Sequence, residues 1–134
     1  MIRKYDPNGN GSIFVNTLLG EPRGLAFDVS GNLYVAYAGF SSQIIKFDSG
    51  GNWSVFATGL NPSGLAFDSN GYLYVVNNGN EIMKFNSSGN GSVFTSGLSD
   101  VNFIAIQVPE PATWNLLTSG ALTLLGGLRL RRRS

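Results

Sequence analysis

The hydrophobic and polar positions along residues 1–106 follow the pattern of short β-strands. Brief runs rich in β-branched and aromatic residues alternate with polar positions, and clusters of Gly, Asn, Ser and Asp separate one run from the next. Such runs favour strands, and such clusters favour tight hairpin turns. No segment of this body repeats its apolar residues with the period of a helix. The pattern therefore predicts an all-β body.

The predicted strands recur as an internal repeat of about 40 residues. The segment Ile2–Asp6 returns as Ile44–Asp48 and again as Ile82–Asn86, at offsets of 42 and 38 residues. The segment Pro22–Asp28 returns as Pro62–Asp68, at an offset of 40 residues. Each unit holds four predicted strands, and four antiparallel strands in about 40 residues match one blade of a β-propeller.

The repeat divides the body, residues 1–106, into blades. We expect a partial blade over 1–19, full blades over 20–60 and 61–98, and a partial strand over 99–106, where Ile104-Ala105-Ile106 is a degraded copy of Leu-Ala-Phe. The predicted fold class is all-β, with the antiparallel four-stranded blades of a β-propeller. The chain holds about two and a half blades, which form an incomplete ring, because closed propellers have about four to eight. We expect exposed apolar residues at the blade ends and self-association through the open edges.

The sequence of the repeat resembles the NHL family of propellers over Ile2 to Ile106. The shared features are Gly-Leu-Ala-Phe-Asp, a glycine turn, Leu-Tyr-Val and, after a variable loop, Ile-x-Lys-Phe-Asp. Family members often carry an aspartate after the Tyr-Val strand, followed by a Gly-Asn-Asn-Arg loop. That place holds Tyr37 in one blade and Asn77 in the next. The candidate ligand contacts are Tyr37 and Phe40, which we expect at a loop, together with Asn77 and Asn78; packing between blades is the alternative for the aromatic pair.

Composition narrows the chemistry that the body can perform. The sequence has no histidine and no cysteine, which removes the commonest general base, the commonest metal ligand and any disulfide. Residues 1–108 carry five basic and seven acidic side chains, so no basic surface for nucleic acid is expected. No catalytic residue, no metal site and no cofactor is predicted, and we expect a protein that is not an enzyme.

Acidic residues that follow predicted strands have two interpretations. Asp6–Ile13 resembles the first half of a calcium-binding EF-hand loop, but Thr17 stands where that loop has its bidentate glutamate. The same slot recurs in the next two repeats, where it is typical of a hairpin turn, and we favour a turn throughout. Asp28 and Asp68 also precede Ser-Gly and Asn-Gly turns; the alternative for this pair is a ring of acids at a propeller channel that binds a cation or a sugar.

The C-terminal residues differ in composition from the body. Residues 107–111 form a linker around Pro109-Glu110-Pro111, where the prolines favour extended backbone. Residues 112–128 are 17 positions without a charge, which as a helix would span about 25 Å. An arginine cluster follows, and the positive-inside rule places it in the cytoplasm. We predict one C-terminal transmembrane helix with a basic tail over 112–134; a plain membrane anchor or a buried core helix is the alternative.

The order of these C-terminal elements resembles the PEP-CTERM sorting signal of bacterial surface proteins, which an exosortase in the membrane processes near the Pro-Glu-Pro. The resemblance implies an exosortase and inner-membrane lipid as partners. It also implies an inner-membrane precursor that reaches the cell surface or the extracellular matrix after processing. An export signal is expected upstream of Met1 or lost by truncation, because Met1–Asp6 has the pattern of a strand. The implied sorting motif is Pro109, Glu110 and Pro111, and the implied cytoplasmic anchor is Arg129, Arg131, Arg132 and Arg133.

Both parts of the chain lead to one functional hypothesis. We expect an exported, surface-sorted bacterial NHL-repeat protein that acts as a non-catalytic binding or structural module. Extracellular polysaccharide and other surface proteins are the expected binding partners, and nucleic acid is not. The alternatives are a fragment of a lactonase- or lyase-type propeller enzyme and a truncated, non-functional gene product. A lactonase-like propeller needs a metal held by Glu, Asp and Asn, and the only glutamates of the body, Glu21 and Glu81, stand at non-equivalent positions of the repeat.

Overall fold

The computed structural model describes residues 1–16 and 19–107. The strands of this part form one two-stranded sheet, β1-β2, and two four-stranded sheets, β3-β4-β5-β6 and β7-β8-β9-β10. Within each sheet, strands that are consecutive in sequence pair antiparallel. The prediction of antiparallel four-stranded blades is confirmed. The strands are β1 (Ile2–Tyr5), β2 (Gly11–Val15), β3 (Glu21–Phe27), β4 (Leu33–Ala38), β5 (Gln43–Phe47), β6 (Trp53–Thr58), β7 (Pro62–Phe67), β8 (Leu73–Asn77), β9 (Glu81–Phe85) and β10 (Gly91–Ser96).

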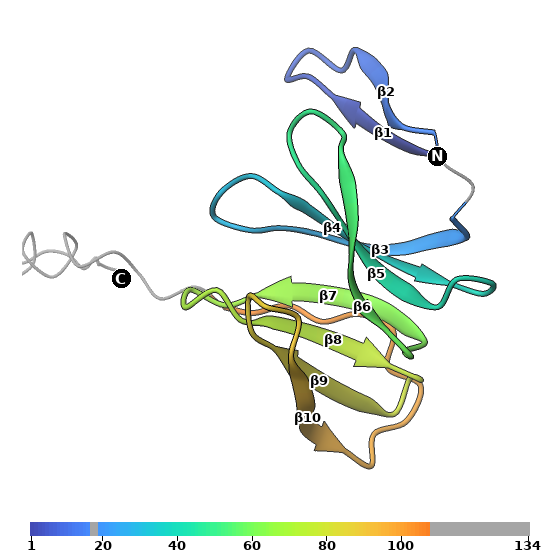
Figure 1. The fold of residues 1–134 in the computed structure, drawn as a ribbon, viewed down its shortest axis with the longest axis vertical. Helices are drawn as coiled ribbons and strands as arrows, with labels where there is room; N and C mark the ends of the chain where they lie inside the picture. Colours follow the sequence, from blue (N-terminus) through green and yellow to red (C-terminus); the bar gives the residue numbers. More distant parts are fainter. Residues whose placement is uncertain (17–18, 108–134) are drawn as a thin grey trace, which may run out of the picture.

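The three sheets are stacked in chain order. Figure 1 shows β1-β2 at one end of the stack, the sheet β3–β6 in the middle and the sheet β7–β10 at the other end. The first strands of the two four-stranded sheets are in contact, and β7 also packs against β4. A Cβ atom at Gly24 of β3 would overlap the backbone of Ser63 in β7, so glycine permits this close approach.

The central strand β4 is buried along its whole length because both faces of its sheet are covered. Successive side chains of a strand point to opposite faces. Tyr34 and Ala36 accordingly join the apolar cluster shared with the sheet β7–β10. Leu33, Val35 and Tyr37 join a second cluster, which includes Ile2 and Val15 of the sheet β1-β2. Two apolar layers therefore hold the three sheets together.

The hairpin turns between strands use one repeated hydrogen-bond pattern. In the turn between β3 and β4, Asp28 Oδ1 accepts the backbone N–H groups of Ser30 and Asn32 at 3.0 and 2.9 Å. Gly31 adopts a positive φ of 85°, which favours glycine. The first residues of the other turns, Asp6, Asp48, Asp68 and Asn86, accept backbone N–H groups in the same way. The interpretation of these residues as turn-forming is confirmed.

The prediction of a strand over 99–106 is wrong. Residues 101–107 form no helix or strand. A Cβ at Gly64 of β7 would lie 2.8 Å from the carbonyl oxygen of Asn102 and 2.9 Å from the Cα of Phe103, so this segment lies directly beside β7. A strand needs a paired neighbour, and the sequence after Gln107 continues into Pro-Glu-Pro instead of the repeat's next strand.

The predicted C-terminal elements are not part of the described structure. Within residues 1–16 and 19–107, no helix has the length and apolar character needed to cross a membrane. The predicted transmembrane helix, the sorting motif at Pro109 to Pro111 and the arginine anchor all lie outside the described residues.

Candidate functional site

The alternating direction of the strands separates the connections into two groups. The hairpin turns that begin at Asp6, Asp28, Asp48, Asp68 and Asn86 lie at one end of the sheets. The β4–β5 loop (39–42), the β8–β9 loop (78–80) and the β6–β7 connection (59–61) lie at the opposite end. We call this second end the loop end. The positions that the sequence marked as candidate ligand contacts all lie at or next to this end, in two different sheets.

The aromatic candidates at the loop end differ sharply in exposure. Tyr37 lies inside β4 and is only 1% exposed, so the expectation that it sits at a loop is wrong. Burial raises the pKa of its phenol. The sheet β1-β2 covers the face of β4 on which Tyr37 lies, and the residue is therefore part of the core. Phe40 is fully exposed in the β4–β5 loop, where a ligand could reach its ring.

Asn77 holds the loop end of the third sheet together. Its side chain is 5% exposed, and its Oδ1 accepts the backbone N–H of Asn61 at 2.8 Å. Its Nδ2 donates to Glu81 Oε2 at 2.8 Å. The next residue, Asn78, is exposed, has a φ of 54° and donates its N–H to the carbonyl of Asn61 at 3.1 Å. Asn77 is thus a structural anchor, and Asn78 is the member of this pair that solvent reaches.

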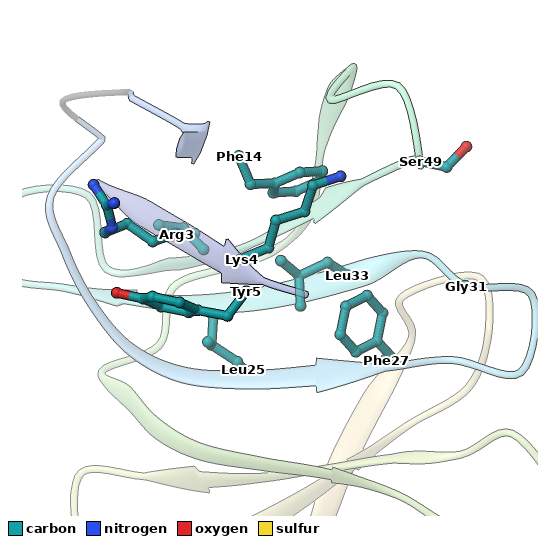
Figure 2. A pocket seen from close by; sticks show the side chains of 10 residues that line it. Arg3, Lys4, Tyr5, Phe14, Leu25, Phe27, Gly31, Leu33 and Ser49 are labelled. Carbon is teal, nitrogen blue, oxygen red and sulfur yellow. The ribbon is translucent and has the colours of Figure 1, made fainter. Parts of the chain in front are cut away.

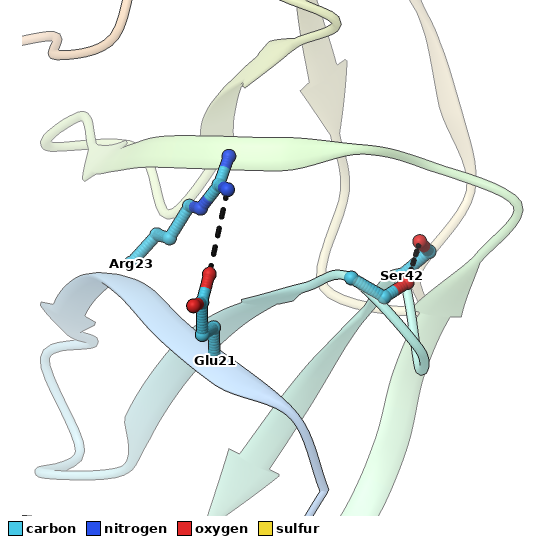
Figure 3. Close-up of polar contacts among 4 residues, drawn as sticks. Glu21, Arg23 and Ser42 are labelled. Atoms are coloured by element: carbon cyan, nitrogen blue, oxygen red, sulfur yellow. Dashed lines mark hydrogen bonds and ion pairs between the residues drawn. The ribbon is translucent and has the colours of Figure 1, made fainter.

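The remaining polar groups of the loop end make few contacts with one another. Figure 3 shows the exposed ion pair between Arg23 Nη2 and Glu21 Oε1 at 3.5 Å, and the hydroxyl of Ser42 donating to the carbonyl of Gly39 at 2.8 Å. The buried hydroxyl of Ser63 has no hydrogen-bond partner among the described residues. In that part of the chain, no three acidic, histidine or cysteine side chains lie close enough together to hold a metal ion.

A cavity lies elsewhere, between β1 and β3. Its volume is about 490 Å³. Figure 2 shows Leu25 and Phe27 of β3 pointing toward β1 across this space. The two side chains are 53% and 67% exposed, although they occupy apolar positions of the repeat. Sequence reasoning predicted exposed apolar residues at the blade ends but not this cavity. The lining residues are Ile2, Arg3, Lys4, Tyr5, Phe14, Leu25, Phe27, Gly31, Leu33 and Ser49.

Consecutive four-stranded antiparallel sheets, packed through their first strands, define a segment of a β-propeller. Comparison with solved structures supports this class. Virginiamycin B lyase from Staphylococcus aureus superimposes with a TM-score of 0.61 and 15% identity, over 75% of this chain and 36% of the lyase. A protein assigned as a gluconolactonase gives a TM-score of 0.64 and 21% identity, over 80% of this chain and 38% of that protein. A gluconolactonase from Xanthomonas campestris gives a TM-score of 0.59 and 28% identity, over 72% of this chain and 35% of that protein.

These similarities establish the fold of the described residues. The chain spans little more than a third of the length of each of these propellers. No family model matches the sequence, and the search of curated proteins finds no significant match. The described residues are therefore a partial β-propeller.

Proposed function

We propose that this chain is a non-catalytic β-propeller module that binds a partner or builds a structure. The observation that carries the proposal is that buried polar groups at the loop end form hydrogen bonds within the protein. Both polar atoms of the Asn77 side chain serve internal hydrogen bonds, and one of those bonds also engages Glu81. Groups that are committed to holding a loop are poorly suited to polarise a substrate, because catalysis needs them free to meet reacting atoms.

The setting that we propose is the bacterial cell surface. The support comes from sequence: the repeat resembles NHL propellers, and the C-terminal residues resemble a PEP-CTERM signal. On this proposal, an exosortase processes the chain at Pro109-Glu110-Pro111 while Arg129–Arg133 stay in the cytoplasm. The mature module then meets extracellular polysaccharide or other surface proteins, and exposed Phe40 and Asn78 are its candidate contacts at the loop end.

A reporter fused after Ser134 tests the sorting part of this proposal. A cytoplasmic reporter should be active and a periplasmic one inactive, because closely spaced arginines resist crossing a bilayer. In a host with an exosortase, mass spectrometry should find the chain shortened near Pro111, and in a host without one the tail should stay attached. Activity of the periplasmic fusion would contradict the proposed orientation, and an unshortened chain in the exosortase host would contradict processing.

The second candidate is a piece of a lactone-hydrolysing or lyase propeller. The similarity to the Xanthomonas campestris gluconolactonase, at 28% identity, favours it. The full chain should be assayed with a panel of aldonolactones in the presence of calcium or zinc, alongside equilibrium dialysis for either ion. The module proposal predicts no hydrolysis above the rate of the free ions and no saturable ion uptake.

A matched pair of variants makes this assay decisive. Glu81 contacts Asn77 at the loop end, whereas Glu21 forms only an exposed ion pair with Arg23. Hydrolysis that Glu81→Gln abolishes and Glu21→Gln leaves intact would refute the non-catalytic proposal. It would also place the reaction at the loop end of the third sheet.

A further inference from the structure

We propose that the hairpin turn between β5 and β6 is a binding site for a neutral polysaccharide, with the exposed indole of Trp53 as the platform for one sugar ring. The site lies at the end of the sheets opposite the loop end, which we call the turn end. The inference rests on the proposed function as a binding module. It places the contact with polysaccharide at the other end of the sheets from Phe40 and Asn78.

A hollow of about 190 Å³ lies beside Trp53. One aromatic ring borders it together with an ammonium, a carboxylate, an amide and a hydroxyl group, from Lys46, Asp48, Asn52 and Ser54. This mixture suits a sugar, because the C–H face of a pyranose packs on an aromatic ring while the hydroxyls at its edge donate and accept hydrogen bonds. Pockets for whole small molecules measure about 300–1,000 Å³, so this smaller hollow suits one ring of a longer chain.

The turn holds the acceptor of this hollow in a fixed orientation. Asp48 Oδ1 accepts the backbone N–H groups of Gly50 and Asn52, both at 2.9 Å, and Oδ2 accepts the side-chain amide of Asn52 at 2.9 Å. The hydrogen bonds from Asn52 hold the pKa of the Asp48 carboxyl below its ordinary value, so the group is ionised at neutral pH. A carboxylate has about four acceptor positions, and Oδ2 therefore keeps one for a sugar hydroxyl.

Lys46 supplies the donor of the hollow. Among the described residues its ammonium forms no ion pair, and it lies 5.7 Å from the centroid of the Tyr34 ring. The register of β5 on β6 places Ser54 opposite Lys46, so the hydroxyl and the ammonium stand on one face of the sheet. An ammonium and a carboxylate on one border can bind two neighbouring hydroxyls of a sugar, one as acceptor and one as donor. Because the two charges offset each other, the hollow favours a neutral polymer over an acidic one.

Trp53 is exposed although its sheet has a neighbour on each side. The residue begins β6 of the middle sheet and is 53% exposed. Figure 1 shows this sheet between β1-β2 and the sheet β7–β10. A Cβ at Gly51 would lie 4.0 Å from the carbonyl oxygen of Phe14 in β2, so the outer strand of the preceding sheet already stands beside this turn. The indole therefore stays open to solvent with that neighbour in place.

The equivalent turns of the repeat form without a tryptophan. Gly11 and Gly91 occupy its place, 42 residues before Trp53 and 38 residues after it. A hollow of about 300 Å³ at the first of these turns has the equivalent polar border, Lys4, Asp6, Asn10 and Ser12. The polar border therefore comes from the turn that the repeat encodes, and the indole is an addition specific to the middle turn. Since folding of the turn does not require the indole, its exposed face is available to a ligand.

The test is calorimetric titration of the full 134-residue chain, in a mild detergent, with an α-glucan, a β-glucan, a mannan and a polyuronate. At least one of the three neutral polymers should bind saturably. Trp53→Ala should weaken that binding about tenfold, because it removes the ring on which the sugar packs. Phe103→Ala, which removes another exposed ring outside the hollow, should leave binding unchanged.

Asp48→Asn separates the sugar contact from the turn itself. Asn86 occupies the equivalent position of the β9–β10 turn, and its Oδ1 accepts two backbone N–H groups at 3.0 Å, so an asparagine can form this turn. The variant should therefore keep the melting temperature within about 4 °C. It should weaken polysaccharide binding about threefold, because a charged acceptor forms the stronger hydrogen bond.

Tryptophan fluorescence provides an independent measurement. The sequence holds two tryptophans, so Trp114→Phe leaves Trp53 as the single emitter. A polymer that binds should shift the emission of Trp53 to shorter wavelength and protect it from quenching by acrylamide, because the sugar displaces water from the indole. Unchanged emission at a saturating concentration of that polymer would overturn the proposal.

The remaining outcomes separate this site from the proposed function. No saturable binding by any neutral polymer, equal binding by the Trp53→Ala chain, or tighter binding of the polyuronate than of every neutral polymer would refute the site alone. Loss of binding in Phe40→Ala but not in Trp53→Ala would refute it as well and would move the contact to the loop end. Lactone hydrolysis together with binding that depends on Trp53 would refute the non-catalytic proposal and leave the site standing.

Discussion

Replacing Tyr34 and Tyr74 by leucine should destabilise the protein to different degrees. The two tyrosines occupy the same position of the repeat, and each has a lysine ammonium at a similar distance, 5.7 and 5.6 Å. Tyr34 contacts two aromatic rings and Tyr74 contacts one, Phe94, at 5.1 Å. Burial, together with the neighbouring Asp28 carboxylate, raises the pKa of Tyr34 to about 12. Comparison of the two variants therefore isolates the contribution that contact with the following sheet makes to the free energy of unfolding.

The expected magnitudes follow from those contacts. Two edge-on aromatic pairs contribute about 1–3 kcal/mol, so Tyr34→Leu should lower the free energy of unfolding by about that amount. Tyr74→Leu loses one pair and should cost about 0.5–1.5 kcal/mol. Urea titration of the full chain, followed by circular dichroism, measures both values.

A third variant separates the rings from the hydroxyl. Tyr34→Phe keeps both aromatic contacts and should cost less than about 1 kcal/mol. Equal losses for Tyr34→Leu and Tyr74→Leu would refute the reasoning, because they would mean that the contact with Phe67 across the two sheets contributes nothing. A loss at Tyr34→Phe as large as at Tyr34→Leu would assign the effect to the hydroxyl instead.

Three further outcomes are expected. Gly64→Ala should cost about 1–3 kcal/mol in urea titration, because its Cβ would lie 2.8 Å from Asn102 O, whereas Gly50→Ala, with 3.4 Å to its nearest neighbours, should be near neutral. Burial opposes ionisation of Asp28, but hydrogen bonds from Asn32 and Ser30 outweigh it and hold the pKa of the Asp28 carboxyl below 3.8. The ionised carboxylate therefore stabilises the folded state above pH 3.8, and this stabilisation is lost as the pH falls through the pKa of the folded state. Asp28→Asn should make the melting temperature less sensitive to pH between pH 5 and about 3. Millimolar calcium should shift the melting temperature by less than about 1 °C, because three N–H groups already occupy the Asp6 carboxylate, and a rise of about 10 °C would contradict this.

The strands and turns could be predicted from the sequence because their causes are local. The alternation of apolar residues sets which face of a strand is buried, and Asp or Asn before a glycine fixes each turn. In the β9–β10 turn, Asn86 replaces the aspartate and its Oδ1 still accepts two backbone N–H groups, both at 3.0 Å. Recurrence of these local signals about every 40 residues was enough to indicate propeller blades.

The candidate site could be predicted only in part, because burial depends on neighbours that are distant in sequence. Tyr37 and Asn77 occupy the same position of the repeat, yet one packs under the sheet β1-β2 and the other anchors a loop through Asn61 and Glu81. Nothing in the local sequence distinguishes a ligand contact from either role. The segment 99–106 fails for a related reason: its apolar pattern suits a strand, but a strand also requires a partner.

The cavity at β1 shows how far position in the stack outweighs sequence. Leu25 and Leu65 share the motif Gly-Leu-Ala-Phe-Asp, and their exposures are 53% and 7%. In a repeat array each unit draws much of its stability from the units on either side, so identical residues contribute differently at an end and in the middle. In the described residues, β4 packs over the apolar residues of β7, and no strand packs over Leu25 and Phe27 of β3 in the same way. The neighbouring sheet therefore sets the burial of a repeat position, and the strongest case is Phe27, which is 67% exposed while its equivalent Phe67 packs against Tyr34.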